Sequence, residues 1–559
     1  ADANGGRAGL LEIMAGSGAF QNAGTLVGTA GEGRQGGSFA LDVLELPDYS
    51  EINTPLEAGG FNASRAIRVR TGDVVLDQDS TSRIFRLSTD AGSILVSSGI
   101  DASGKNGGTI SLSASGSLTL AEGASLSVAA ENSDSAGKGG LIELFAGSQI
   151  NGAVNPTATL SIQSGSIIDL SVADYVAGGY LDQGSSAFLG KFQGKLHLRA
   201  PRTDTNTDLR LDPIEGSITG ASAIAVEGYR LFDRTGADGV MDIALRDSVN
   251  ADATDFMANE SAIQNRIVAG DLADITVVAP GVEIINTAGD LTLGLANPEG
   301  TDNLEGLSGA DWDLSTWRYG TKSAPGFLTL RASGDIVFNN SLSDGFVSVQ
   351  PGIDDPSIYT NNLSYEENGH SKLWLAQLQT IRDGLPINLQ SWSYTLAAGS
   401  DQNSADWRGT LGLDLLEENK GSILVGEFYP AVVNSLNPDT NPDAPQADAG
   451  VGQYATTANH LRINITEIDE GTGLLKDMGT RYEVVRTGAG DIAIQAGRDV
   501  QLRNQFASIY TAGVALPDAT RIFEPGDFSK PIVNFDQTSH PEQGALGRSS
   551  QRYEAQWAM

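Results

Sequence analysis

A short phrase recurs along this chain: a glycine, a small polar or acidic residue, and then alternating apolar positions. It occurs at residues 92–96 (GSILV), 116–120 (GSLTL), 165–170 (GSIIDL), 289–293 (GDLTL), 334–338 (GDIVF) and 490–494 (GDIAI). A tight turn that starts a short strand, repeated along one chain, is typical of a solenoid. Because each repeat contacts only its neighbours, 559 residues can extend without one large globular core.

Paired glycines introduce further strands, at residues 36–41, 107–112 and 139–144. Their spacing predicts rungs of roughly 20–30 residues. In residues 111–120 (SLSASGSLTL), apolar side chains occupy every second position. This alternation predicts strands whose Leu and Ala face the interior while Ser and Thr face water. We therefore expect an all-β chain that winds into a parallel β-helix, with irregular loops outside the helix and one or two short α-helices.

The phrase is not continuous, and its interruptions divide the chain. The expected segments are a regular shaft at 1–226, a helical excursion at 227–270, strands at 271–343 with an irregular loop at 297–325, an irregular insertion at 344–395, strands at 396–514 with a Pro/Asp/Asn loop near 437–450, and a nonrepetitive end at 515–559. Within the excursion, Asp252 or Thr254 is expected to cap a helix that runs to about Val268 and stops at Gly270. Phe256, Ile263 and Ile267 share one face of that helix.

The charge balance restricts the partners. The chain has 70 acidic and 35 basic side chains, a formal net charge of −35, which repels nucleic acid and anionic lipid headgroups. We therefore expect no nucleic-acid partner. The chain has no cysteine, so disulfides contribute nothing to its stability. No run approaches roughly 18 consecutive apolar residues, so no helix is expected to span a membrane.

Three segments resemble the large filamentous-haemagglutinin-like exoproteins and adhesins of Gram-negative bacteria. They are residues 326–336 (GFLTLRASGDI), 392–399 (WSYTLAAG) and 481–505, which contains RYEVVRTGAGDI and GRDVQLRNQ. The resemblance implies a right-handed parallel β-helix that an outer-membrane transporter exports by two-partner secretion. It also implies an extracellular or cell-surface location. The family's N-terminal secretion domain is not recognisable, so the chain resembles shaft, and no family site residue is carried over.

From these features we expect a structural or adhesive segment of a surface or filament-forming protein, which holds contact loops away from the cell. The expected partners are a host, neighbouring-cell or glycan surface, and more of the same chain or identical copies along the axis, because an open β-helix exposes strand edges at its ends. Two alternatives stay open: a carbohydrate-binding or polysaccharide-degrading β-helix, and the stalk of a contact-dependent toxin-delivery protein. With roughly twenty rungs, the rod would span about 100 Å.

Tryptophans supply the main support for a glycan-binding alternative. Trp312, Trp317, Trp374 and Trp392 lie in or beside the irregular segments, where solenoids commonly carry binding residues. We favour the simpler interpretation that these aromatic side chains pin their loops onto the stack.

Motifs for catalysis and cofactor binding are weak, and we expect neither catalytic nor cofactor-binding residues. Residues 31–36 (GEGRQG) match the dinucleotide fingerprint, but a strand rather than the required helix follows them. The four histidines, His197, His370, His460 and His540, lack metal-ligand spacing.

Acidic loops are the remaining metal candidates. They are residues 233–242, which contain Asp233, Asp238 and Asp242, and residues 77–79, which contain Asp77 and Asp79. Calcium takes six to eight oxygen ligands, and neither loop has the spacing of a known calcium loop. We favour solvated acidic turns, and the sequence leaves calcium binding undecided.

Overall fold

The described part of the protein is mostly β, with 41% of its residues in strands and 11% in helices. The computed structural model describes residues 6–131, 139–172, 194–294, 312–346, 365–366, 378–426, 464–468, 475–481, 483–503 and 507–514. The expected loop at 437–450 and the nonrepetitive segment 515–559 lie outside these residues. So does most of the insertion expected at 344–395.

A twelve-stranded parallel sheet runs through the whole molecule. Its strands in spatial order are β1 (Leu10–Ala15), β2 (Ser38–Val43), β3 (Ser64–Val69), β6 (Ile84–Thr89), β9 (Thr109–Ala114), β12 (Leu141–Phe145), β15 (Gly194–Pro201), β17 (Ala221–Asp233), β19 (Thr276–Asn286), β22 (Phe327–Ala332), β26 (Ser393–Ala398) and β31 (Ile492–Ala496). Spatial order follows sequence order, so each strand pairs with an earlier and a later pass of the chain. We call this the long sheet.

Four shorter parallel sheets accompany the long sheet. Two belong to the first half of the chain: β4 (Val74–Leu76), β7 (Ile94–Val96), β10 (Leu118–Leu120) and β13 (Leu160–Ile162); and β5 (Ser80–Thr81), β8 (Gly99–Asp101), β11 (Ser125–Ser127), β14 (Ile167–Asp169) and β16 (Ser217–Thr219). Two belong to the second half: β18 (Val240–Met241), β20 (Leu291–Leu293), β23 (Ile336–Phe338), β27 (Ile423–Val425) and β32 (Val500–Leu502); and β21 (Trp312–Asp313), β24 (Leu342–Ser343), β30 (Val484–Thr487) and β33 (Ser508–Thr511). Most passes visit the long sheet and then two short sheets, and we call one pass a rung.

The recurring glycine phrase marks strand starts, as predicted. It introduces β7, β10, β14, β20, β23 and β31 in turn. At Gly92 the stack requires glycine, since a Cβ there would lie 2.0 Å from the carbonyl oxygen of Gly72 in the preceding rung. Paired residues are 20 to 32 positions apart from β1 to β12, close to the expected rung length. From β12 onward the spacing varies from 27 to 98, because long insertions separate the strands.

The long sheet bends sharply at β17 and β19. In a flat sheet β15 and β31, five positions apart, would lie about 24 Å from each other. Instead, Nζ of Lys195 on β15 lies 2.6 Å from Oδ2 of Asp491, which precedes β31. His197 of β15 stacks on Phe327 of β22 with ring centroids 4.5 Å apart, although two strands separate them in the sheet. The outer face of the long sheet, which points away from the short sheets, therefore folds onto itself.

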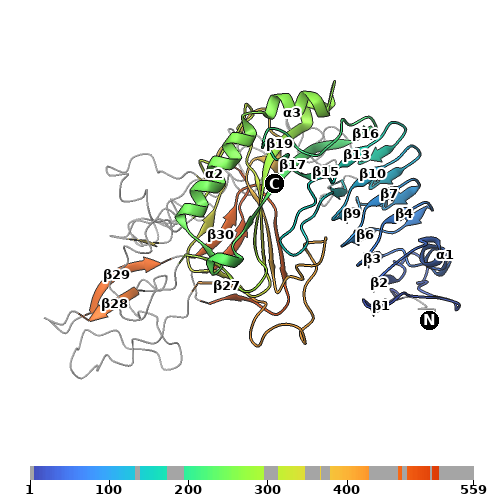
Figure 1. Ribbon diagram of the computed structural model, residues 1–559, viewed down its shortest axis with the longest axis horizontal. Helices are drawn as coiled ribbons and strands as arrows, with labels where there is room; N and C mark the ends of the chain where they lie inside the picture. The colour runs from blue at the N-terminus through green and yellow to red at the C-terminus, as the bar shows by residue number, and fades with distance from the viewer. Residues whose placement is uncertain are drawn as a thin grey trace, which may run out of the picture.

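The bend divides the molecule into a first limb (described residues from 10 to 219), a junction (221–286) and a second limb (described residues from 287 to 511). Figure 1 shows the first limb in blue and cyan on the right, the junction in green at the top, and the second limb in yellow to red on the left. The sequence did not indicate this bend. The described strands form a bent stack with twelve strands in its long sheet.

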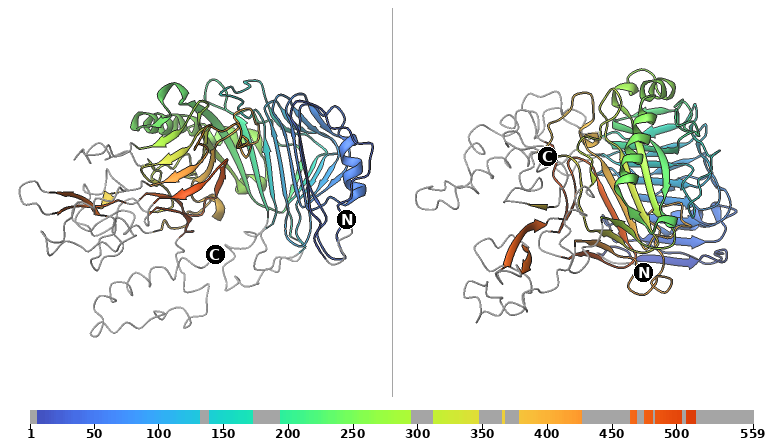
Figure 2. Two further views of the ribbon diagram at one scale, coloured as in Figure 1. Left: turned by 90° about the horizontal axis from the view of Figure 1, so that it is seen from below. Right: turned by 60° about the vertical axis from the view of Figure 1, so that its left-hand side comes forward.

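Three helices occupy the junction on the side away from the bend's concave face: α2 (Ile243–Met257), α3 (Glu260–Ile267) and α4 (Leu272–Ile275). With α1 (Ser50–Gly59), the described residues contain four α-helices, more than the one or two expected. Two short 3₁₀ turns, Thr235–Ala237 and Ile387–Leu389, and an antiparallel sheet of β25 (Tyr365–Glu366), β29 (Leu475–Arg481) and β28 (Asn464–Ile468) complete the described elements. Figure 2 shows α2 and α3 over the junction strands from two further directions.

The helix expected between residue 252 or 254 and Val268 begins earlier and is broken in two. Asp242 caps α2, because its Oδ1 accepts a hydrogen bond from the Leu245 amide at 2.7 Å. Thr254 lies inside α2, where its hydroxyl bonds to the carbonyl of Asn250. The expected apolar face is confirmed: Phe256, Ile263 and Ile267 are buried in the same core as the strands.

These helices fill the gap that the bend opens between the short sheets. The first-limb short sheets end at β13 and β16, and the second-limb short sheets begin at β18 and β21. Phe256 of α2 packs against Gly228 of β17, on the inner face of the long sheet. The core therefore continues through the junction without a break. No helix among the described residues is long and apolar enough to cross a membrane.

Candidate functional site

The tryptophans expected in irregular loops are buried. Trp312, Trp317 and Trp392 are 1%, 8% and 1% exposed, and the Trp317 ring centroid lies 6.0 Å from those of the other two. The indole Nε1 of Trp392 donates a hydrogen bond to the carbonyl of Trp317 at 3.1 Å. These three side chains pin loops to the stack, as we favoured, and none offers a ring face for stacking on a sugar. Trp374 lies outside the described residues.

The acidic loops serve local structure. Oδ1 of Asp233 accepts the Thr235 amide at 2.8 Å, and Asp242 caps α2 while it also contacts Arg234 at 3.3 Å. Oδ1 of Asp79 accepts the amide of Gly99 in the next rung at 2.8 Å. Across the described ranges, no cluster of three or more His, Cys, Asp or Glu side chains is arranged to hold a metal ion.

The glycine fingerprint and the four histidines are the remaining motifs from the sequence. The glycine fingerprint at 31–36 leads into strand β2, as expected, and not into a helix. His370, His460 and His540 lie outside the described residues, whereas His197 belongs to β15. His197 is part of the main polar cluster that the sequence did not predict.

That cluster lies on the concave outer face of the bend. Strand β15 contributes His197 and Arg199, β17 contributes Glu227 and Tyr229, β19 contributes Glu283, and β22 contributes Arg331. In each strand these residues alternate with core residues such as Leu198 and Val226, so they face away from the rung interior. In a straight stack they would be exposed to solvent. Here the opposite limb covers them, and Glu227, Glu283 and Arg331 are at most 2% exposed.

Oppositely charged side chains alternate through the cluster. Arg199 donates from Nε to Oε1 of Glu227 at 2.9 Å and from Nη2 to Oε2 of Glu283 at 2.5 Å. Its guanidinium lies 3.6 Å from the ring centroid of Tyr229. Arg331 donates to Oε1 of Glu283 at 3.4 Å. His197 Nε2 lies 2.8 Å from Oε2 of Glu227.

The electrostatics of the cluster are those of structural ion pairs. Burial acts to raise the pKa of Glu227, but Arg199 and His197 outweigh it, and that pKa is lowered. Burial also raises the pKa of the Tyr229 phenol well above its ordinary value. At neutral pH, Glu227 is therefore a carboxylate and Tyr229 a neutral phenol. A carboxyl acting as a general acid needs its pKa raised, and Glu227 has the opposite shift.

A loop from the second limb contacts the first limb beside this cluster. Residues 399–411, which we call the latch, follow β26 and lie on the outer faces of β3, β6, β9 and β12. Arg408 donates to Oε2 of Glu143 at 2.6 Å and to the hydroxyl of Ser111 at 3.3 Å. Asp401 pairs with Arg68 at 2.7 Å, and the Ala405 amide donates to Oδ1 of Asp90 at 2.8 Å.

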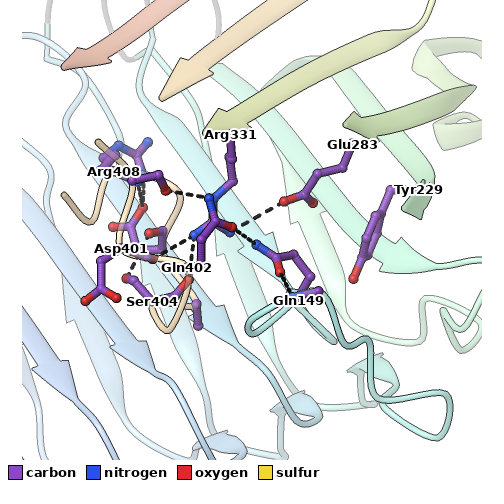
Figure 3. Close-up of polar contacts among 12 residues, drawn as sticks. Gln149, Tyr229, Glu283, Arg331, Asp401, Gln402, Ser404 and Arg408 are labelled. Carbon is purple, nitrogen blue, oxygen red and sulfur yellow. Dashed lines mark hydrogen bonds and ion pairs between the residues drawn. The ribbon is translucent and has the colours of Figure 1, made fainter. Parts of the chain in front are cut away.

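The latch corrects the expectation that outward Ser side chains in 111–120 face water. Ser111 and Ser113 are 2% and 1% exposed, because the second limb covers this part of β9. The latch is also joined to the charged cluster. Arg331 donates from Nη2 to the carbonyls of Asp401 and Ser404, both at 3.0 Å. Figure 3 shows Arg331 between Glu283 on one side and the latch on the other.

Amides extend the contact toward the turn after β12. The side chains of Gln149 and Gln402 share a hydrogen bond of 3.1 Å, and the Asn151 amide donates to the Gln402 carbonyl at 2.6 Å. One sequence signal for the assembly is the run of basic residues at alternate positions in β15, Lys195, His197 and Arg199. That pattern is the one expected of a solvent-facing strand, so it does not predict that these side chains contact buried residues of other strands.

Comparisons with known proteins found no matching family model, no similar curated protein and no similar solved structure. The interpretation of function therefore depends on the residues and the fold.

Proposed function

We propose that the chain is a right-handed parallel β-helix and a structural, adhesive segment of a large exported surface or filament-forming protein. One observation carries the proposal. The three segments that resemble filamentous-haemagglutinin-like exoproteins coincide with β22, with β26, and with β30 to β32. Strands β22, β26 and β31 are consecutive in the long sheet, so the resemblance follows successive rungs of one architecture.

In this proposal the mechanism is mechanical. Backbone hydrogen bonds between rungs, together with inward rows such as Leu112, Leu144 and Leu198, hold the stack. Loops that leave the stack present contact surfaces to a host cell, a neighbouring cell or a glycan. Export is through an outer-membrane transporter to the extracellular surface.

The ends of the long sheet are the proposed sites of continuation along the axis. Strands β1 and β31 are its two outermost strands. Leu10 and Met14 of β1 are 64% and 75% exposed, and Val500 and Leu502 of β32 are 49% and 51% exposed. Outermost strands with exposed apolar side chains favour pairing with another strand. We propose that further rungs of the same protein, or an identical copy, stack there.

Surface display tests the function. The chain is fused to the secretion domain of a two-partner exoprotein, with an epitope inserted beside Leu413 and Leu415, which are 65% and 69% exposed. The epitope is detected with an antibody on intact Gram-negative cells that carry the matching outer-membrane transporter. The proposal predicts labelling of intact cells that disappears when the transporter is deleted. Labelling that appears only after lysis would contradict it.

The architecture is tested separately. Electron cryomicroscopy of the purified chain should show parallel strands about 4.8 Å apart along a right-handed coil. A left-handed coil, or antiparallel strands in the long sheet, would contradict the proposed fold whatever the result of the display experiment.

A further inference from the structure

We propose that the latch is releasable: the two limbs separate about the junction when the contacts of residues 399–411 break, so the bent stack is the closed state of a hinge. The inference concerns the fold and does not depend on the proposed surface function. Three features of the described residues support it, and each bears on a different requirement of a hinge.

The first requirement is that the contacts have an alternative partner when the limbs separate. The first-limb side chains that the latch engages, Arg68, Asp90, Ser111, Glu143 and Gln149, are all polar. Four of them project from the outer face of a strand or its immediate end, where water would solvate them in an open stack. Separation therefore exchanges protein hydrogen bonds for water hydrogen bonds, at a small net cost for each bond.

The second requirement is that the closed state is not held too tightly. The contact between the limbs contains partly buried ion pairs, Arg408–Glu143 and Arg68–Asp401, whose side chains are 9% to 21% exposed. Forming such a pair removes two charges from water, and this desolvation offsets most of the attraction between them. These pairs therefore add little net free energy to closure, as two populated states require.

The third requirement is a pivot. At the junction the short sheets are interrupted while the long sheet continues through β17 and β19. The outer faces of these strands carry small residues at Ala225, Ala279 and Gly281. Ala225 and Ala279, together with Gly326 and Phe327, line a small apolar cavity. Among the described parallel sheets, the long sheet is the one that continues through the junction, so opening requires it to flex beside the packed helices α2 and α3.

Asp90 gives the latch a dependence on pH. Its carboxylate lies between Arg68 of β3 and the latch. Arg68 also contacts Asp42 of β2. From the latch, Asp401 and the Ala405 amide face Asp90. Burial, opposed by Arg68, raises the pKa of Asp90 to about 6 from an ordinary value of 3.8. Opening would hydrate Asp90 and return its pKa toward 3.8. The closed state therefore binds the proton more tightly, and lowering the pH from 7.5 to 5 favours closure.

The chain contains no cysteine, so a spin-label pair can be introduced without other changes. Val75→Cys on β4 and Val500→Cys on β32 place labels at exposed positions on the two limbs. Distances between the labels are measured by double electron–electron resonance at pH 7.5. Asp401→Asn combined with Arg408→Ala is expected to raise the long-distance population about tenfold. Lys420→Ala, which breaks a pair with Asp290 inside the second limb, is the matched control and should leave the distribution unchanged.

Hydrogen exchange of β6, β9 and β12 in each variant establishes that the rungs remain folded. If the double variant unfolds the first limb because of Arg408→Ala, the measurement is made with the single variant Asp401→Asn. The distance distribution at pH 5 should be narrower and shorter than at pH 7.5, and Asp90→Asn should abolish this difference. An unchanged distribution in a folded latch variant, or a pH effect that survives Asp90→Asn, overturns the proposal.

Discussion

Arg408 and Glu143 lie 265 positions apart in the sequence, and their side chains meet with Nη2 2.6 Å from Oε2. Glu143 is on β12 in the first limb, and Arg408 is in the latch of the second. No contact between neighbouring rungs of a straight stack would join them. The pair therefore reports the bend directly.

Removing Arg408 leaves a buried carboxylate without its main partner. Burial acts to raise the pKa of Glu143, but Arg408 outweighs it and lowers that pKa. Arg408→Ala is expected to lower the free energy of unfolding by about 1.5 kcal/mol in chemical denaturation, since opening of the latch hydrates Glu143 and limits the loss. Arg408→Met with Glu143→Leu removes both charges and should recover most of this loss. Arg246→Ala, whose partner Asp247 is 65% exposed, is the control and should change stability by about 0.5 kcal/mol or less. Equal losses in all three variants would contradict the conclusion that the Arg408–Glu143 pair stabilises the fold.

Asp242, and not Thr254, should carry the cap of α2. Asp242→Ala removes the acceptor of the Leu245 amide and is expected to cost about 1 kcal/mol. Thr254→Ala places a better helix former inside an exposed turn and is expected to be neutral or stabilising by roughly a few tenths of a kcal/mol. Thermal melts of the two variants compare them. The reverse order would indicate that the helix starts near residue 254, as the sequence first suggested.

Close contact between β17 and α2 makes Gly228 intolerant of a side chain. A Cβ at this position would lie 2.4 Å from Cζ of Phe256. Gly228→Ala is therefore expected to destabilise the chain by about 1–3 kcal/mol. Adding Phe256→Leu, which shortens the opposing ring, should recover part of the loss. Gly236→Ala meets nothing within 4 Å and is the control. A loss at residue 236 as large as that at residue 228 would show that the packing of α2 is not the cause.

Alkaline unfolding should depend on Tyr49. Burial raises the pKa of this phenol to about 12 from an ordinary value of 10.0, and its hydroxyl lies 2.7 Å from that of Ser80. Between pH 10 and 12 the folded chain keeps a proton that the unfolded chain loses. The stability from this group is therefore complete below pH 10 and declines as the pH rises toward 12. Denaturation followed across this range should show a decline that is smaller in Tyr49→Phe. Identical pH profiles would rule out Tyr49 as the cause.

The sequence predicted the strands well because their signals are local. A glycine that the rung above would crowd, followed by alternating apolar residues, identifies β10 or β23 without knowledge of any distant partner. The face of Phe256, Ile263 and Ile267 was found for the same reason. The start of α2 was missed because Asp252 and Thr254 are, like Asp242, residue types that cap helices. Only the structure shows that Asp242 accepts the hydrogen bond from the Leu245 amide.

The bend could not be predicted. Its contacts join residues far apart in the sequence, such as Gln149 with Gln402, 253 positions apart, and Asp90 with Ala405, 315 positions apart. Each of these residues lies where a straight stack would expose it, so the polar side chains among them follow the pattern of a solvated surface. Ser111 and Ser113 show the ambiguity: their alternation with Leu112 correctly placed them on the outer face but gave no indication that a second limb covers it.

The most direct test of the bend uses the unmodified chain. A zero-length carbodiimide cross-linker joins an amine to a carboxylate only when they are in contact. Nζ of Lys195 lies 2.6 Å from Oδ2 of Asp491 across the bend, and Nζ of Lys420 lies 2.5 Å from Oδ2 of Asp290 within one limb. Mass spectrometry should find both cross-links, and Lys195→Arg should remove only the first. Recovery of the Lys420–Asp290 link without the Lys195–Asp491 link would contradict the folding of the long sheet onto its own outer face.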